Sequence, residues 1–237
     1  MNRTICATDW EVKALLAGRL TTLWRPVPGG GVFKRSGGDW YWEVVRRART
    51  YHGVVPNKTA AYSAMAELSP YGQPGDMLAV KECWRPWYRT GGRCTHGAEG
   101  ILYRADESSV EMRLPLGCWQ FGRARDWRSS ATMPRWAVRP GFVRPITGVA
   151  VKRVQAMTPT DVIAAAVQGM IGGKYGCRQC NNAGWTFSHP DKCPGCNGTG
   201  EDPVGYFRVA WDARYVNTSY TWPKNPLAWG ITIVGKQ

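Results

Sequence analysis

The stretch FVRPITGVAVKRVQAMTPTDVIAAAVQGM, residues 142–170, carries the two signals that decide the fold, a strand followed by a helix. The apolar residues of its first half, residues 142–154, predict one interrupted strand or a pair of strands. In the second half Thr158 is a predicted helix N-cap, followed by a proline and, three residues after the cap, by Asp161. Gly169 is the expected end of this helix.

Similar patterns continue on both sides of that stretch. Further strands are predicted at residues 77–84 (MLAVKECW), 101–105 (ILYRA) and 227–235 (LAWGITIVG), and further helices at residues 9–18 and 203–215 (PVGYFRVAWDARY). The helix over 9–18 rests on Thr8 and Glu11, which have capping-box spacing. This order of segments predicts an α+β fold with a mostly antiparallel sheet.

Glycine-rich segments predict where the domain is interrupted. A turn is expected at RPVPGGG, residues 25–31, and residues 28–62 are predicted to form an insertion with a strand or helix around residues 39–45. The chain of 237 residues is 43% hydrophobic, which is a globular composition and predicts one domain with insertions. It contains no apolar run of about 18 residues, and its first residues lack the pattern of a signal peptide, so we expect a cytoplasmic protein.

Positive charge is concentrated in one part of the chain. The formal net charge is +14, and residues 112–153 alone hold nine Lys or Arg against Asp126, a net of +8. Five Trp or Phe residues alternate with these cations. Guanidinium groups bind phosphates and flat rings stack on unpaired bases, so this stretch predicts a nucleic-acid surface. A solvated basic face whose tryptophans belong to the core is the alternative.

Four cysteines are paired within CRQCNNAGWTFSHPDKCPGCNGTG, residues 177–200. Two C-x-x-C turns supply the four thiolates that a structural zinc ion needs, so we expect one zinc per chain and no open coordination position for catalysis. The expected ligands are Cys177, Cys180, Cys193 and Cys196. The second turn, CPGCNGTG, resembles the zinc knuckles of DnaJ-type chaperones. A redox dithiol is the alternative, and His189 could replace one sulfur.

Several motifs occur in a fixed order along the chain. They are ALLAGRLTTLWRPV, YGQPGDMLAVKECW, YRAD, MPRWAVR, ITGVAVKRVQAMTPTDVIAAAVQGM and FRVAWDARY followed by WPKNPLAWGITIV. Together they resemble the ASCH-domain proteins of phages and prophages, which are relatives of the PUA domain. The resemblance implies a partly closed β-barrel with flanking helices, a cleft beside the first helix, and a link to RNA, nucleotides or modified bases. The barrel domain would span residues 1–176 and 201–237, with the zinc knuckle at 177–200 as an insertion.

An enzymatic branch of that family removes an acetyl group from modified cytidine, using a lysine, a threonine and a glutamate. The matching positions here are Leu20, Leu23 and Ala165, which carry no ionisable or nucleophilic group. We therefore expect a non-catalytic binding protein. The alternative is a nucleoside amidohydrolase or ribonuclease with a relocated site, in which Arg19, Arg25, Thr21 and Thr22 act with Glu82 or Asp76.

The expected partner is RNA, single-stranded DNA or a modified nucleotide, and a weaker alternative is an acidic host protein in the cytoplasm of a phage-infected cell. The predicted ligand-binding residues come from the loop after the first helix and from the basic stretch. They are Arg19, Thr21, Thr22, Arg25, Arg123, Arg125, Arg128, Arg135 and Trp136.

Overall fold

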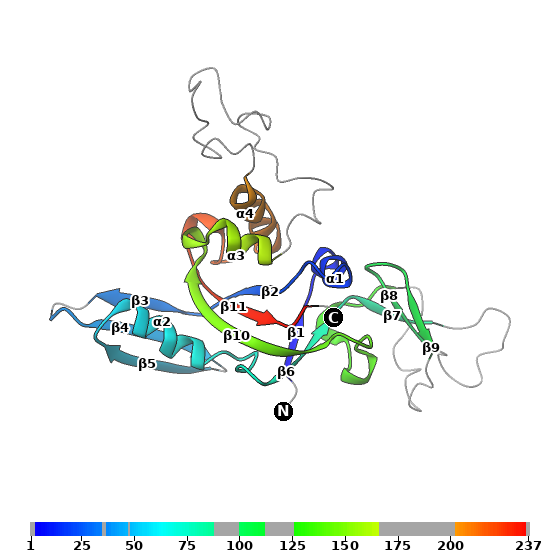
Figure 1. Ribbon diagram of the computed structural model, residues 1–237, viewed down its shortest axis with the longest axis horizontal. Helices are drawn as coiled ribbons and strands as arrows, with labels where there is room; N and C mark the ends of the chain where they lie inside the picture. Colours follow the sequence, from blue (N-terminus) through cyan, green and yellow to red (C-terminus); the bar gives the residue numbers. More distant parts are fainter. Residues whose placement is uncertain are drawn as a thin grey trace, which may run out of the picture.

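A five-stranded mixed sheet forms the centre of the protein (Figure 1). The computed structural model describes residues 3–34, 37–46, 48–87, 100–111, 126–165 and 202–235. In spatial order the strands are β1 (Arg3–Cys6), β6 (Met77–Lys81), β10 (Val143–Arg153), β11 (Leu227–Ile233) and β2 (Thr22–Pro26). Only β1 and β6 are parallel, so the predicted α+β fold with a mostly antiparallel sheet is confirmed. Within the described residues the sheet does not close into a barrel.

The stretch 142–154 is one long strand, β10, rather than a pair of strands. Its first three residues pair with β6, and the rest pair with β11. The register shifts between Ile146 and Gly148, where β10 passes from one partner to the other. A bulge of this kind bends a strand, and Figure 1 shows the long curve of β10 below β2 and β11.

The predicted insertion at residues 28–62 contains a separate antiparallel sheet and the first half of a helix. Its strands are β3 (Gly31–Lys34), β4 (Trp40–Arg46) and β5 (Arg49–Val55), followed by α2 (Lys58–Glu67). Of the two alternatives predicted around residues 39–45, a strand or a helix, the structure has the strand, β4. Asn57 caps α2 by accepting a hydrogen bond from the Ala60 amide at 2.8 Å.

A third sheet lies at the opposite end of the molecule from β3–β5 (Figure 1). Its strands are β7 (Trp84–Trp87), β8 (Gly100–Tyr103) and β9 (Ser109–Glu111). The stretch 77–84, predicted as one strand, is divided between β6 and the start of β7, and the strand predicted at 101–105 is β8. Two short 3-10 helices, η2 (Ser130–Thr132) and η3 (Arg135–Ala137), follow in the described chain.

The helices begin where the capping residues predict. In α1 (Asp9–Leu16) Thr8 and Glu11 form the capping box, and in α3 (Pro159–Ala164) Thr158 and Asp161 form another. The predicted end of the latter helix, Gly169, lies outside the described residues. The predicted helix 203–215 is α4 (Pro203–Arg214), capped by Asp202. Further 3-10 helices are η4 (Val154–Ala156) and η6 (Trp222–Lys224).

The buried apolar side chains form three clusters. The largest surrounds the central sheet and contains both Leu20 and Leu23. The second joins α3 and α4 to the sheet through Trp24, Phe207 and Trp211. The third lies under β7, β8 and η3 and contains Trp84. No helix in the described residues is long and apolar enough to cross a membrane.

Candidate nucleic-acid interface

Three charged residues from distant parts of the chain meet beside the first helix. Glu11 lies in α1, Arg25 in β2 and Arg214 in α4. Arg25 Nη1 donates to Glu11 Oε1 at 2.7 Å, and Arg214 Nη1 donates to Oε2 at 2.6 Å. Both arginines also donate to the carbonyl oxygen of Cys6. Arg25 was predicted to bind a ligand, but its guanidinium is buried and engaged in these bonds.

The carboxylate of Glu11 is a poor proton acceptor. Burial alone raises its pKa, but the two guanidinium groups and its hydrogen bonds outweigh burial and lower the pKa to about 2. Thr8 contributes two of these bonds, from its amide and its hydroxyl. A base with so low a pKa offers little general-base assistance near neutral pH.

Aromatic side chains fill the space around these charges. The lining consists of Trp10, Trp24, Phe207 and Trp211 with Ala165, Ala210 and the three charged residues. Gly230 lies beneath Trp24, and a Cβ there would come within 2.5 Å of the indole ring. The remaining volume of about 20 Å³ is room for about one water molecule.

The three positions that the resemblance to ASCH enzymes compares with catalytic residues lie in the core. Leu20, Leu23 and Ala165 are all at most 3% exposed. The two threonines beside them have structural partners, since the Thr21 amide donates to the Ala164 carbonyl at 2.9 Å and the Thr22 hydroxyl lies 3.4 Å from that of Thr232.

The two acids proposed for a relocated site have other partners. Glu82 accepts two hydrogen bonds from Arg139, at 2.9 and 3.0 Å. Asp76 accepts one from the Gln73 amide at 2.9 Å. Arg19 is exposed after α1. No contact in the described residues joins these acids to Arg19 or to the two threonines.

A second group of predicted residues does come together, around Trp84. The indole of Trp84 is fully buried, and the Arg128 guanidinium lies 5.5 Å from the centre of its ring. Backbone hydrogen bonds pair Trp84 with Arg128 in both directions, at 2.8 and 3.2 Å. Trp136 packs edge-on against Trp84, with 6.5 Å between ring centroids.

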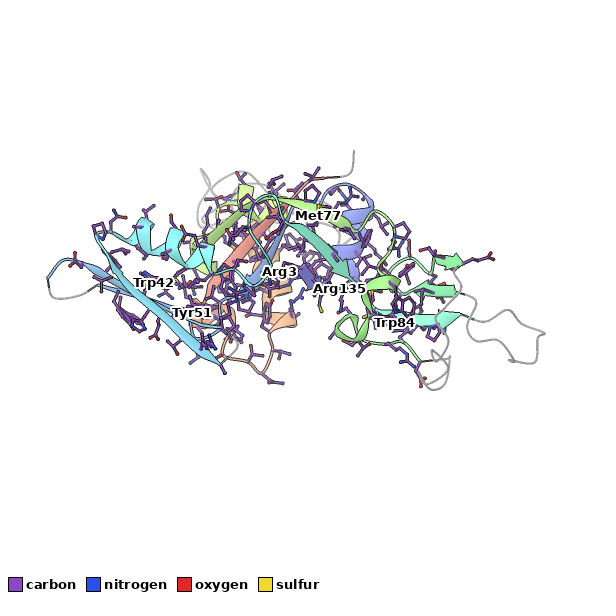
Figure 2. The ribbon with its side chains drawn as sticks, turned by 90° about the horizontal axis from the view of Figure 1, so that it is seen from below. Arg3, Trp42, Tyr51, Met77, Trp84 and Arg135 are labelled. Atoms are coloured by element: carbon purple, nitrogen blue, oxygen red, sulfur yellow. The ribbon has the colours of Figure 1, made fainter. Side chains whose placement is uncertain are left out.

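The outer part of this group reaches the surface. Trp136 keeps 39% of its area exposed, and Arg135 next to it is also exposed. Arg85, from β7, holds its guanidinium 4.6 Å from the ring centre of Trp127. Figure 2 shows Trp84 and Arg135 at the same end of the molecule. We call Arg128, Arg135 and Trp136, which lie around the buried Trp84, the tryptophan–arginine surface.

Several predicted site residues lie outside the described residues. These are Arg123, Arg125 and the four cysteines Cys177, Cys180, Cys193 and Cys196. In the described part of the chain, no three His, Cys, Asp or Glu side chains are grouped as a metal site. Cys6 and Cys83, which were not predicted as ligands, are free thiols.

Sequence reasoning missed the charged cluster beside α1. Glu11 was recognised only as a capping residue, and Arg214 only as part of a helix. No local pattern connects two residues separated by 203 positions, so only the fold reveals their contact. No family model matches the chain, and neither a curated protein nor a solved structure matches it.

Proposed function

We propose that the protein is a non-catalytic module that binds RNA or single-stranded DNA through its tryptophan–arginine surface. The observation that carries this proposal is the exposed ring of Trp136, which is anchored on the buried Trp84 and stands beside the exposed Arg135. A rigid ring loses little freedom when a base stacks on it, and an adjacent guanidinium can bind the phosphate. The resemblance to ASCH and PUA domains supports the same class of ligand.

Charge also supports this proposal. The stretch of residues 112–153, which contains Arg128, Arg135 and Trp136, has a net charge of +8. Such an excess attracts polyanions and gives binding that depends strongly on salt.

The geometry beside α1 favours binding without catalysis. Leu20, Leu23 and Ala165 supply no nucleophile, and the carboxylate in this pocket, Glu11, has its pKa lowered to about 2 by two arginines. Covalent and acid–base catalysis both need such groups within reach of a substrate. The volume of about 20 Å³ beside Glu11 is also too small for a nucleobase.

Trp136→Leu tests the proposal directly. We expect about a tenfold loss of affinity for a fluorescently labelled 12-nucleotide oligo-dT, because stacking of one base on an aromatic ring is worth about 1–3 kcal/mol. Fluorescence anisotropy measures the affinity. Arg208→Ala, which removes an exposed cation from α4, is the control for charge alone. Equal affinity of Trp136→Leu and the unmodified protein would argue against this surface.

The zinc site remains a prediction from the sequence. Elemental analysis is expected to find about one zinc per chain, since four thiolates complete a tetrahedral site. Cys180→Ser is expected to lose the metal because one ligand is removed. Cys83→Ser, which changes a free thiol, is expected to keep it. A native preparation without zinc would refute the assignment.

A further inference from the structure

A cavity of about 460 Å³ lies between the start of α2 and the end of β10. Lys58, Thr59 and Tyr62 of α2 form one wall. The other wall comes from the end of β10, from η4 and from Asn225 at the end of η6. α2 packs against β10 and against the β4–β5 hairpin (Figure 1). Small-molecule sites usually measure about 300–1,000 Å³, so this cavity has the size of a ligand site.

The wall formed by β10 and η4 is held in shape by its own hydrogen bonds. Arg153 Nη1 donates to the Asn225 carbonyl oxygen at 2.8 Å, and the Gln155 amide donates to Asn225 Oδ1 at 3.1 Å. Gln155 Nε2 donates to the carbonyl oxygen of Trp222 at 2.8 Å. Because a carbonyl oxygen carries no net charge, these bonds position the half-buried guanidinium of Arg153 without neutralising it.

The opposite wall holds a second cation in place. Lys58 is exposed, and its Nζ lies 5.9 Å from the ring centre of Trp40 and 5.6 Å from that of Tyr62. The faces of aromatic rings attract a cation at such distances. Both rings are partly buried against the main core cluster, so they form a fixed support for the ammonium group.

Charge identifies the class of ligand. The described residues that line the cavity include two cations, Lys58 and Arg153, and none of them is acidic. Nor does either cation form an ion pair with a carboxylate in the described part of the chain. A guanidinium fork matches two oxygens of a phosphate, and a lysine binds the same group as a point charge. Thr59 and Tyr62 add hydroxyl groups that can donate hydrogen bonds.

We propose that this cavity binds a small phosphorylated molecule, with its phosphate group between Lys58 and Arg153. A volume of about 460 Å³ is larger than a phosphate ion, so it has room for the organic group that bears the phosphate. The site lies on elements other than those of the tryptophan–arginine surface, and the inference does not rest on the proposed function. A free nucleotide and the terminal phosphate of a nucleic acid share this chemistry.

Isothermal titration calorimetry tests the site with uridine 5′-monophosphate, inorganic phosphate and uridine. We expect the two phosphate compounds to bind and uridine not to bind. Lys58→Gln, which changes an exposed side chain, is expected to weaken binding of the monophosphate about tenfold, because one charge-assisted contact is lost. Arg153→Gln is expected to have a similar effect. Arg208→Gln removes the same charge at an exposed position of α4 and is the control.

A second experiment identifies the source of the phosphate. A 12-nucleotide oligo-dT is compared with and without a 5′-phosphate. Tighter binding of the phosphorylated oligomer, abolished by Lys58→Gln, would assign the site to nucleic-acid ends. Equal binding of the two oligomers, with binding of the monophosphate retained, would assign it to a free nucleotide. If neither oligomer bound, the proposed function would fail, while binding of the monophosphate would still support this site.

Protection from acylation locates the bound phosphate. At a monophosphate concentration ten times its Kd, about a tenth of the sites stay empty, so we expect reaction of Lys58 with acetic anhydride to slow about tenfold. Mass spectrometry of peptides measures the reaction. Lys13, an exposed lysine of α1, is the control and is expected to react at an unchanged rate. Unchanged labelling of Lys58 would contradict the inference.

Three further outcomes would overturn it. The first is that neither phosphate compound binds at millimolar concentration. The second is an equal loss of affinity in Lys58→Gln, Arg153→Gln and Arg208→Gln, which would show an effect of net charge alone. The third is that uridine or malonate binds as tightly as the monophosphate, which would show that the cavity does not recognise phosphate. Circular dichroism and thermal unfolding establish that each variant is folded.

Discussion

Glu11→Gln is expected to lower the free energy of unfolding by about 3–5 kcal/mol, because it leaves buried guanidinium groups without their counter-charge. Arg25 is only 5% exposed, and Arg214 loses the 2.6 Å bond to Glu11 Oε2. Glutamine has nearly the same size as glutamate, so the loss of stability measures the missing negative charge rather than a change in packing. Urea unfolding followed by circular dichroism measures the effect. Glu67→Gln, at an exposed position in α2, is the control and is expected to change stability little.

The same carboxylate makes stability depend on pH in acid. The pKa of Glu11 is about 2 in the folded protein against an ordinary value of 4.5, so its contribution is complete above pH 4.5. As the pH falls from 4.5 towards 2, the unfolded chain binds a proton at this site and the folded protein does not. The expected loss of stability over this interval is about 3 kcal/mol. Glu11→Gln abolishes this part of the pH dependence, and an identical pH profile for both proteins would contradict the assignment.

Arg139→Leu is expected to have an effect of similar size, about 3–5 kcal/mol, because it leaves Glu82 buried and unpaired. Arg139 donates two hydrogen bonds to Glu82 and two to Asp106, at 2.7–3.0 Å. Burial already raises the pKa of Glu82, and the arginine opposes this effect. Without Arg139 the carboxyl group is expected to be protonated at a higher pH.

An exposed ion pair in the same region provides the comparison. Arg104 Nε donates to Asp9 at 2.8 Å, and these side chains are 41% and 34% exposed. Exposed ion pairs contribute roughly 0–1 kcal/mol to stability. Arg104→Leu is therefore expected to change the free energy of unfolding very little in the same urea experiment. If Arg104→Leu and Arg139→Leu destabilised the protein equally, burial would not be the deciding factor.

Elements that depend on residues close together in the chain were predicted well from the sequence. Thr8 and Thr158 were predicted as N-caps from their spacing to Glu11 and Asp161, and both capping boxes are present. A cap depends only on residues three positions apart, so the sequence contains all the information needed. The strands β8 and β11 were predicted for a similar reason, since their apolar residues are contiguous.

Elements that depend on tertiary contacts were missed. The loop expected after the first helix includes GRLTTL, residues 18–23, but its last two residues begin β2, where Leu23 is buried against β11. β1 has only four residues, and its parallel pairing with β6 joins segments far apart in the chain. α2 lay partly within the predicted insertion, where basic and glycine-rich sequences obscured it.

The candidate site was predictable only in part. The sequence grouped Arg128, Arg135 and Trp136 as one basic, aromatic region, and the structure places Arg128 and Trp136 against Trp84. It could not show that Arg25 is neutralised by Glu11, because that contact depends on how α1 packs against β2. The grouping of Phe33, Tyr41 and His52 was also missed, because these residues come from three strands whose register is set by pairing.

The salt dependence of oligonucleotide binding tests the central claim most directly. Each phosphate neutralised on a single strand contributes about 0.7 to the slope of log affinity against log salt, so contacts with several arginines predict a slope of several units. Changing Arg123, Arg125 and Arg128 together to alanine is expected to flatten that slope by about two units. The proposal predicts tight binding of oligo-dT at low salt that weakens steeply as salt is added. Absence of binding at low ionic strength, or an affinity that salt does not change, would contradict it.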